Sequence, residues 1–234
     1  MFAAIFEILP KQERYEDYLT LAKQLRSLLQ KMDGFVDSER FESQTRGGWI
    51  LSVSTWRDEK SMIRWRTTGE HHRIQQKGRF EIFQDYHLRV GEVTADTDAP
   101  KEAPFKEQRF DETEVGTAKL LTLTDLIQDR EKPIGPPADL LSMPDLSLAD
   151  SGVVERDVFV SIYTPGKIAV VVAWKDAMSA DGWTPVKTRN VYKLRHRKIR
   201  VIRGYGMFDR REAPQFFHDG RETRHTQDHW NRQL

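Results

Sequence analysis

The chain has 234 residues, of which 38% are hydrophobic and 31% are charged, enough for two ordinary domains with solvated surfaces. Its formal net charge is only +1, so no overall field draws it to nucleic acid or to a membrane, and we expect neither partner. The absence of cysteine excludes disulfides, cysteine-ligated zinc, iron–sulfur clusters and thiol catalysis. The apolar run at residues 2–10 is too short to span a bilayer and has no basic region. These features predict a cytoplasmic protein.

Residues 1–94 alternate strand and helix signals. The apolar run Phe2–Leu9 ends at Pro10 and predicts a buried strand. An amphipathic helix follows, because apolar residues recur at spacings of three and four. These residues are Tyr15, Tyr18, Leu19, Ala22, Leu25, Leu29 and Met32. Gly34 can adopt the left-handed conformation that commonly ends a helix.

The remainder of this region predicts a hairpin, a second helix and a closing strand. Phe35–Ser43 and Trp49–Trp56 are strand-like runs joined by a turn that contains two glycines. Asp58 is a suitable N-cap for a helix that Gly69 interrupts. A last strand is expected near Tyr86–Val93. The order βαββαβ is that of a ferredoxin-like domain.

The second half of the chain repeats this plan in a weaker form. Residues 95–114 are polar and contain two prolines, which indicates a linker. Within residues 115–214 the expected strands are Ala118–Ile127, Val158–Tyr163, Ile168–Trp174 and Lys193–Met207. Residues 132–147 allow one short helix at most, and residues 177–183 allow a helical turn. We interpret this half as a degenerate ferredoxin-like domain, and an unrelated α+β domain is the alternative.

The last twenty residues, 215–234, form a polar C-terminal tail. His225 and His229 have the i, i+4 spacing of two metal ligands on a helix, but no third ligand accompanies them. We therefore expect no metal site in the chain.

The segment from Trp65 to Arg79 contains the most chemically informative residues. It places an indole, a guanidinium, a carboxylate and an imidazole on short helical turns just before a strand. Such groups can line a pocket for an aromatic ligand and move protons within it. The alternative is helix packing, in which Trp65 anchors the helix to the sheet.

This segment resembles the second-helix pattern of the antibiotic biosynthesis monooxygenase domain family, which is close to W-R-x-x-x-E-H-x-x-x-Q-x-x-G-R. The matching residues are Trp65, Arg66, Glu70, His71, Gln75, Gly78 and Arg79. The family's R-x-Y-G-M segment, followed by an A-P pair, is matched near the end of the second half. The matching residues there are Arg203, Tyr205, Gly206, Met207, Ala213 and Pro214.

The resemblance implies a fold and an assembly. Domains of this family usually pair sheet to sheet into a dimeric α+β barrel. We therefore expect an α+β chain with tandem ferredoxin-like domains that form such a barrel internally, as a pseudo-dimer. A further homodimer is left open.

The resemblance also implies a chemistry. Family members bind a polycyclic phenol, deprotonate it and let the anion react with dioxygen without metal or flavin. The expected function is thus a monooxygenase that acts on a small aromatic ligand and needs no cofactor. Haem degradation, with a histidine of the same helix as iron ligand, is one alternative. A non-catalytic binding or structural barrel protein is another.

Six residues are the candidates for the site. His71, Glu7 and Glu70 are the catalytic candidates, with His71 as the base and Glu70 orienting its imidazole. Glu7 lies inside the first apolar strand, where an acid must find a partner such as an arginine or face a cavity. The substrate-binding candidates are Trp65, Arg66 and Gln75.

These residues lie in the first half of the chain, which predicts one pocket there with the second half as its lid. The nearest imidazole of the second half, His196, lies in a strand among Arg195, Arg197 and Lys198, and these disfavour its protonated form. The run Arg203-Gly204-Tyr205-Gly206 imitates the start of an RNA-recognition motif, but the next residues break that pattern.

Overall fold

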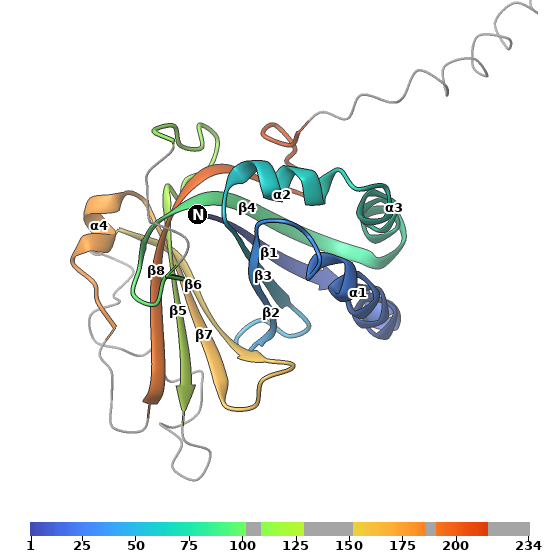
Figure 1. The fold of residues 1–234 in the computed structure, drawn as a ribbon, viewed down its shortest axis with the longest axis horizontal. Coiled ribbons are helices and arrows are strands. Elements are labelled where there is room, and N and C mark those ends of the chain that lie inside the picture. Colours follow the sequence, from blue (N-terminus) through green and yellow to red (C-terminus); the bar gives the residue numbers. More distant parts are fainter. Residues whose placement is uncertain (102–108, 129–151, 186–190, 215–234) are drawn as a thin grey trace, which may run out of the picture.

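The strands of both halves form one closed barrel. A computed structural model describes residues 1–101, 109–128, 152–185 and 191–214 (Figure 1). Eight strands close in the order β1-β3-β2-β6-β7-β5-β8-β4. Their bounds are β1 Phe2–Pro10, β2 Phe35–Ser43, β3 Ile50–Trp56, β4 Phe83–Asp96, β5 Leu120–Gln128, β6 Val153–Ser161, β7 Lys167–Trp174 and β8 Val191–Gly206. The predicted α+β class and the expected strands are confirmed, although β4 begins earlier and continues beyond the predicted end.

The helices of the first half lie together on the outer face of the barrel (Figure 1). Their bounds are η1 Gln12–Arg14, α1 Tyr15–Leu29, α2 Glu59–Arg66, α3 Gly69–Lys77 and η2 Gly78–Ile82. The period of three and four correctly predicted the buried side of α1, which includes Tyr18, Ala22 and Leu25. Asp58 caps α2 as expected, because its Oδ1 accepts the backbone N–H of Ser61 at 2.7 Å.

The second half has one short helix among the described residues, α4 (Ala177–Asp181). The predicted short helix within residues 132–147 and the tail with His225 and His229 lie outside the described residues. Among the helices that the structure does describe, none is long and apolar enough to cross a membrane.

Each half contributes four neighbouring strands in the same order. The first half supplies β4-β1-β3-β2 and the second supplies β8-β5-β7-β6. The halves meet where β2 pairs with β6 and where β4 pairs with β8, and both pairings are antiparallel. The barrel interior is therefore shared by both halves.

The centre of the barrel is apolar, and ion pairs lie toward its two ends. The central cluster includes Ile5, Leu51, Leu123, Phe159 and Ile199. At one end Arg89 contacts Glu7 and Glu155, and at the other Arg197 contacts Asp125 and approaches Asp37. These equivalent pairs satisfy charges that would otherwise be costly to bury.

Candidate functional site

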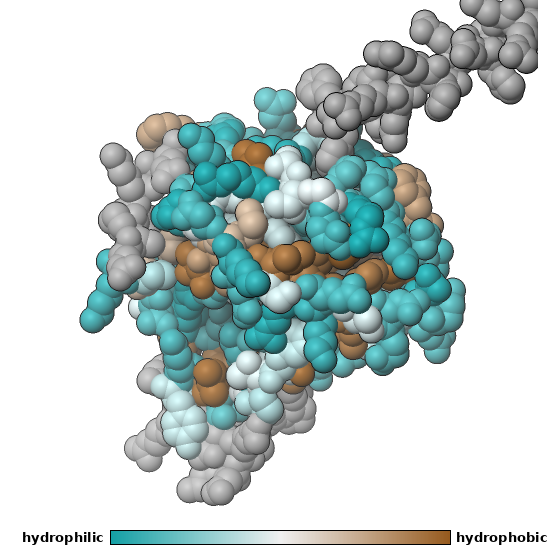
Figure 2. Space-filling model, turned by 45° about the vertical axis from the view of Figure 1, so that its right-hand side comes forward, coloured by the Kyte–Doolittle hydropathy of each residue, from teal (hydrophilic) through white to brown (hydrophobic). Residues whose placement is uncertain are grey.

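A cavity of about 260 Å³ lies between the outer face of the first-half sheet and helices α1, α2 and α3. Aliphatic and aromatic side chains make up most of its walls. They include Ala4, Phe6, Ala22, Leu25, Leu29, Trp56, Met62, Ile74, Phe83, Leu88 and Val90. Figure 2 shows apolar side chains exposed in a strip between hydrophilic rims on the face where α1 and α3 come forward. The prediction of a pocket formed mainly by the first half of the chain is confirmed.

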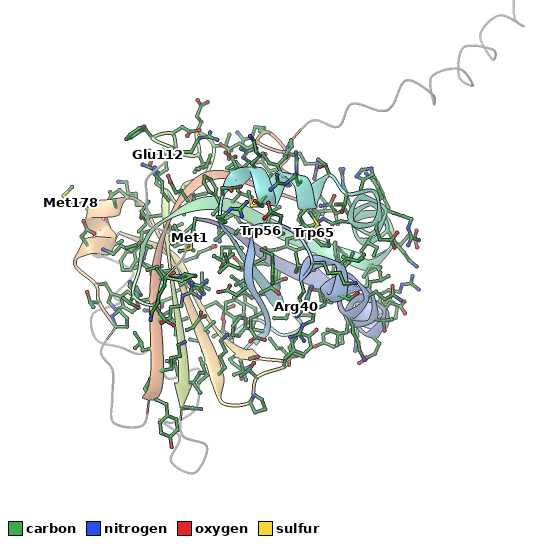
Figure 3. The ribbon with its side chains drawn as sticks, viewed as in Figure 1. Met1, Arg40, Trp56, Trp65, Glu112 and Met178 are labelled. Carbon is green, nitrogen blue, oxygen red and sulfur yellow. The ribbon has the colours of Figure 1, made fainter. Side chains whose placement is uncertain are left out.

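Four of the six predicted site residues line this cavity: Trp65, Arg66, His71 and Gln75. Trp65 lies at the C-terminal end of α2, and His71 and Gln75 come from α3. The break between the two helices lets the chain turn so that α3 residues face the same space as Trp65. Figure 3 shows Trp56 and Trp65 beneath α2, with Arg40 on the α1 side.

The imidazole of His71 stacks on the indole of Trp65. The ring centroids are 4.3 Å apart and the ring planes differ by 18°. His71 Nδ1 lies 3.1 Å from the backbone oxygen of Trp65. Because a carbonyl oxygen only accepts hydrogen bonds, Nδ1 carries a proton in this arrangement and Nε2 presents a lone pair. One face of the indole is thereby covered by the imidazole, and Trp65 remains part of the cavity wall.

Burial keeps the His71 imidazole neutral. The pKa of His71 is lowered to about 4, mainly by burial and in part by the neighbouring His72, although the hydrogen bond to the Trp65 backbone opposes this shift. The base form is therefore fully populated at neutral pH. Its intrinsic basicity is low until an anion forms beside it.

The structure does not bring Glu7 to the cavity. Successive residues of a strand point to opposite faces, and Phe6 faces the cavity while Glu7 points into the barrel. Glu7 is 5% exposed and accepts hydrogen bonds from Arg89 at 2.9 Å and from Arg46 at 2.5 Å. The structure thus shows the alternative considered for Glu7, a buried ion pair with arginine.

Glu70 also lies outside the cavity. It is exposed in the first turn of α3 and accepts a hydrogen bond from Arg73 at 2.5 Å. Adjacent residues of a helix are about 100° apart around its axis, so Glu70 faces solvent while His71 faces the cavity. The Nδ1 atom of His71 is oriented by the Trp65 backbone instead of by this carboxylate.

Several polar cavity residues were missed from the sequence. They are Tyr18, Ser38, Arg40, Ser52, Ser54, Tyr86, Tyr205 and Arg210. The alternation of Ser38 and Arg40 along β2, opposite Ser54 and Ser52 of β3, was a usable signal for one polar face of the sheet. Burial raises the pKa of Tyr205, against Arg66, Arg210 and Arg203, which lower it.

Among the described residues, one cluster of three side chains has the chemistry of metal ligands, and it lies in the barrel and not in the cavity. Ligand atoms of Glu7, His87 and Glu155 lie within 4.8 Å of one another. Arg89 bonds both carboxylates of this group. A guanidinium between the two acids opposes a second cation, so these residues do not fit a metal site.

The second half has a partial counterpart of the aromatic stack. The Trp183 and His196 rings are 5.4 Å apart at 65°, and Trp174 lies 6.1 Å from Trp183. Burial, together with the positive charge of Lys198, lowers the pKa of His196 to about 4. His196 Nδ1 lies 2.9 Å from Thr124 Oγ1. The edge-on geometry of this pair differs from the face-to-face stack in the first half.

Comparison with known proteins decides the family. The family model described as antibiotic biosynthesis monooxygenase matches residues 1–77. A protein of Pyricularia oryzae named jasmonate monooxygenase ABM is 39% identical over 222 residues, which is 93% of this chain and 98% of the relative. The chain belongs to the antibiotic biosynthesis monooxygenase family. The expected resemblance is thus confirmed, and the match to the relative extends through the second half.

Two solved structures of aldoxime dehydratase have a similar fold. One is 12% identical, with a TM-score of 0.55 over 86% of this chain and 80% of that one. The other, in complex with butyraldoxime, is 11% identical, with a TM-score of 0.51 over 86% of this chain and 79% of that one. At these identities the similarity concerns the fold alone. Proteins whose sequences differ widely from this chain therefore adopt a similar fold.

The two buried imidazoles make stability depend on pH. The pKa of His71 and of His196 is about 4 in the folded protein, against 6.5 for an ordinary histidine. The unfolded chain therefore binds more protons between pH 6.5 and 4, and the free energy of unfolding falls as the pH is lowered across this window. We expect up to about 3 kcal/mol per imidazole.

Urea unfolding at pH 7.5 and pH 4.5 checks this expectation. The double variant H71Q/H196Q, which cannot titrate at these positions, should lose less stability than the wild type over the same interval. An equal loss in both proteins would assign the effect to carboxylates.

Proposed function

We propose that this chain is a monooxygenase that oxidises a small aromatic substrate with dioxygen in the first-half cavity, without metal or flavin. Membership of the family and a relative named a monooxygenase support the reaction class. The observation that carries the proposal is the stacked Trp65–His71 pair, which presents a lone pair on Nε2 at the wall of an apolar cavity. Trp65, Arg66 and Gln75 bind the substrate, and His71 is the catalytic base.

The proposed reaction begins with proton transfer from a phenolic hydroxyl of the substrate to His71 Nε2. The phenolate and the imidazolium then stabilise each other as an ion pair, which offsets the low basicity of the buried ring. The electron-rich ring reacts with dioxygen and becomes a quinone. One oxygen atom enters the ring carbon in place of hydrogen, and the other leaves as water with that hydrogen and the hydroxyl proton. The substrate supplies all four electrons, so no external reductant is required.

The cavity favours this chemistry because its apolar walls exclude water from the anion that must react with dioxygen. Haem degradation is the second enzymatic candidate, since the Nε2 lone pair of His71 is also able to ligate iron. A barrel that binds the ligand without turnover is the third candidate. Only the first of these predicts oxygen incorporation by the protein alone.

We also propose that the barrel is a tandem pseudo-dimer with domains at residues 1–94 and 115–214 and a linker at 95–114. Matching local features support it. Asp58 caps α2 by accepting the backbone N–H of Ser61, and Asp176 caps α4 by accepting that of Ser179. Gly34 and Gly152 both have positive φ, and an added Cβ at either would lie 2.1 Å from the hydroxyl of the corresponding serine. The second half then replaces the partner subunit, and further self-association is left open.

Oxygen labelling tests the proposed function. The protein is dialysed against EDTA, shown by absorbance to lack flavin, and incubated with 1-naphthol under 18O2. We expect 1,4-naphthoquinone with one labelled oxygen. The name of the relative makes jasmonate, a cyclic keto acid, the second compound to test. No label in any product, or label only after metal, flavin or hemin is added, would refute the proposal.

A further inference from the structure

We propose that the substrate of this cavity carries a carboxylate and that Arg40 binds it. This inference rests on the proposed function for the location of the site, and adds the charge of the substrate and its orientation. Arg40 is a substrate-binding residue in this proposal. It lies on β2, beside α1, where its Nε donates to Tyr18 (Figure 3).

The charged residues that line the cavity are mostly cationic. The arginines are Arg40, Arg66, Arg79, Arg203 and Arg210. The only carboxylate among the described lining residues is Glu59, which already accepts hydrogen bonds from Arg203 at 2.7 Å and from Arg109 at 2.6 Å. The cavity therefore has a positive potential that favours an anionic ligand.

Arg40 contacts tyrosine hydroxyls and, within the described part of the chain, has no acidic neighbour in the interactions that surround it. Its Nε donates to the hydroxyl of Tyr18 at 3.3 Å, and its guanidinium also interacts with the side chain of Tyr163. Burial raises the pKa of Tyr18, so its hydroxyl supplies no negative charge to the guanidinium. Among the residues that the structure describes, no carboxylate forms an ion pair with Arg40, whereas Arg89 pairs with Glu7 and Glu155 and Arg197 pairs with Asp125. A partly buried cation without a counter-ion is costly, and a substrate carboxylate removes that cost.

The groups around Arg40 suit a carboxylate. On the cavity side of the sheet Arg40 is directly opposite Ser52, and Ser38 is opposite Ser54. The planar guanidinium can donate two parallel hydrogen bonds to a carboxylate, and the serine hydroxyls supply further donors nearby. The remaining walls are apolar, so the substrate is amphipathic. Its carboxylate points toward β2 and α1, and its ring toward Trp65 and His71.

Binding without turnover tests this inference separately from the reaction. Calorimetric titrations under nitrogen compare two acids, 2-naphthylacetate and jasmonate, with their methyl esters. The wild type is expected to bind at least one acid about 10-fold to 100-fold more tightly than its ester, and R40M to lose this preference. R40K should retain part of it, because the charge remains and the bidentate geometry is lost.

The matched control is R26Q. Arg26 is exposed on α1 and lies 5.2 Å from the Tyr163 ring, but it does not line the cavity. This variant should keep the wild-type preference for the acid. Thermal unfolding supplies a second readout, since replacing a partly buried cation that has no carboxylate partner with methionine should leave Tm unchanged or raise it.

Equal affinity for acid and ester, no saturable binding of either acid, or an acid preference that persists in R40M would overturn the inference. A lower Tm in R40M together with an unchanged preference would assign Arg40 a structural role. Arg40-dependent acid binding without label from 18O2 would uphold the inference and refute the proposed function. Labelled naphthoquinone from a protein with no preference for the acids would uphold the proposed function and refute the inference.

Discussion

Replacing Arg197 with methionine is expected to lower the free energy of unfolding by about 3–5 kcal/mol. Arg197 is 2% exposed inside the barrel, where its Nη2 lies 2.5 Å from Asp125 Oδ2 and its Nη1 donates to Thr55 at 3.0 Å. Removing the guanidinium leaves the Asp125 carboxylate buried without its cation. Urea unfolding of the wild type and R197M at pH 7.5 measures the loss.

Two further variants separate this effect from a general loss of packing. R203M removes an ion pair to Glu59 whose side chains are 28% and 17% exposed, and it should cost less than about 1 kcal/mol. The double variant R197M/D125L removes both charges and should recover much of the loss. A single-variant cost near 1 kcal/mol, or no recovery in the double variant, would show that the barrel does not depend on this pair.

Replacing His71 with alanine is expected to lower kcat/KM in the oxygen-labelling assay by about 10²-fold to 10⁴-fold, the usual contribution of a positioned base. The imidazole that faces the cavity is removed, whereas the apolar walls that bind the ring remain. Initial rates of quinone formation measure the effect. At high pH, where the substrate is already a phenolate, the difference between variant and wild type should shrink.

The other histidines provide controls for this result. His72 is adjacent on α3 but does not line the cavity, and His196 is the buried imidazole of the second half. Turnover should persist in H72A and in H196Q. Loss of turnover in H196Q with an unaffected H71A would place the site in the second half of the chain.

Local sequence patterns were sufficient to predict most of the helices and strands and one wall of the cavity. The helical period gave α1, Asp58 gave the start of α2, and the spacing from Trp65 to Gln75 identified one wall of the cavity. These features depend on interactions within a few residues of one another, which is why one sequence can reveal them.

The sequence could not show which face of β1 is covered by helices. Residues 2–9 are apolar on both faces, because one face packs in the barrel and the other against α1 and α2. Glu7 was therefore assigned to the site, although its face points into the barrel. Arg40 was missed for a related reason, since a charged residue in an alternating strand is typical of a solvated face until the covering helix is placed.

A structure with bound substrate is the most direct test of the claim that chemistry occurs in the first-half cavity. The protein would be crystallised with 1-naphthol under nitrogen, because turnover cannot occur without dioxygen. We predict that the ring occupies the cavity and that its hydroxyl oxygen lies about 3 Å from His71 Nε2. A ligand bound inside the barrel or beside His196, with the first-half cavity empty, would contradict the assignment.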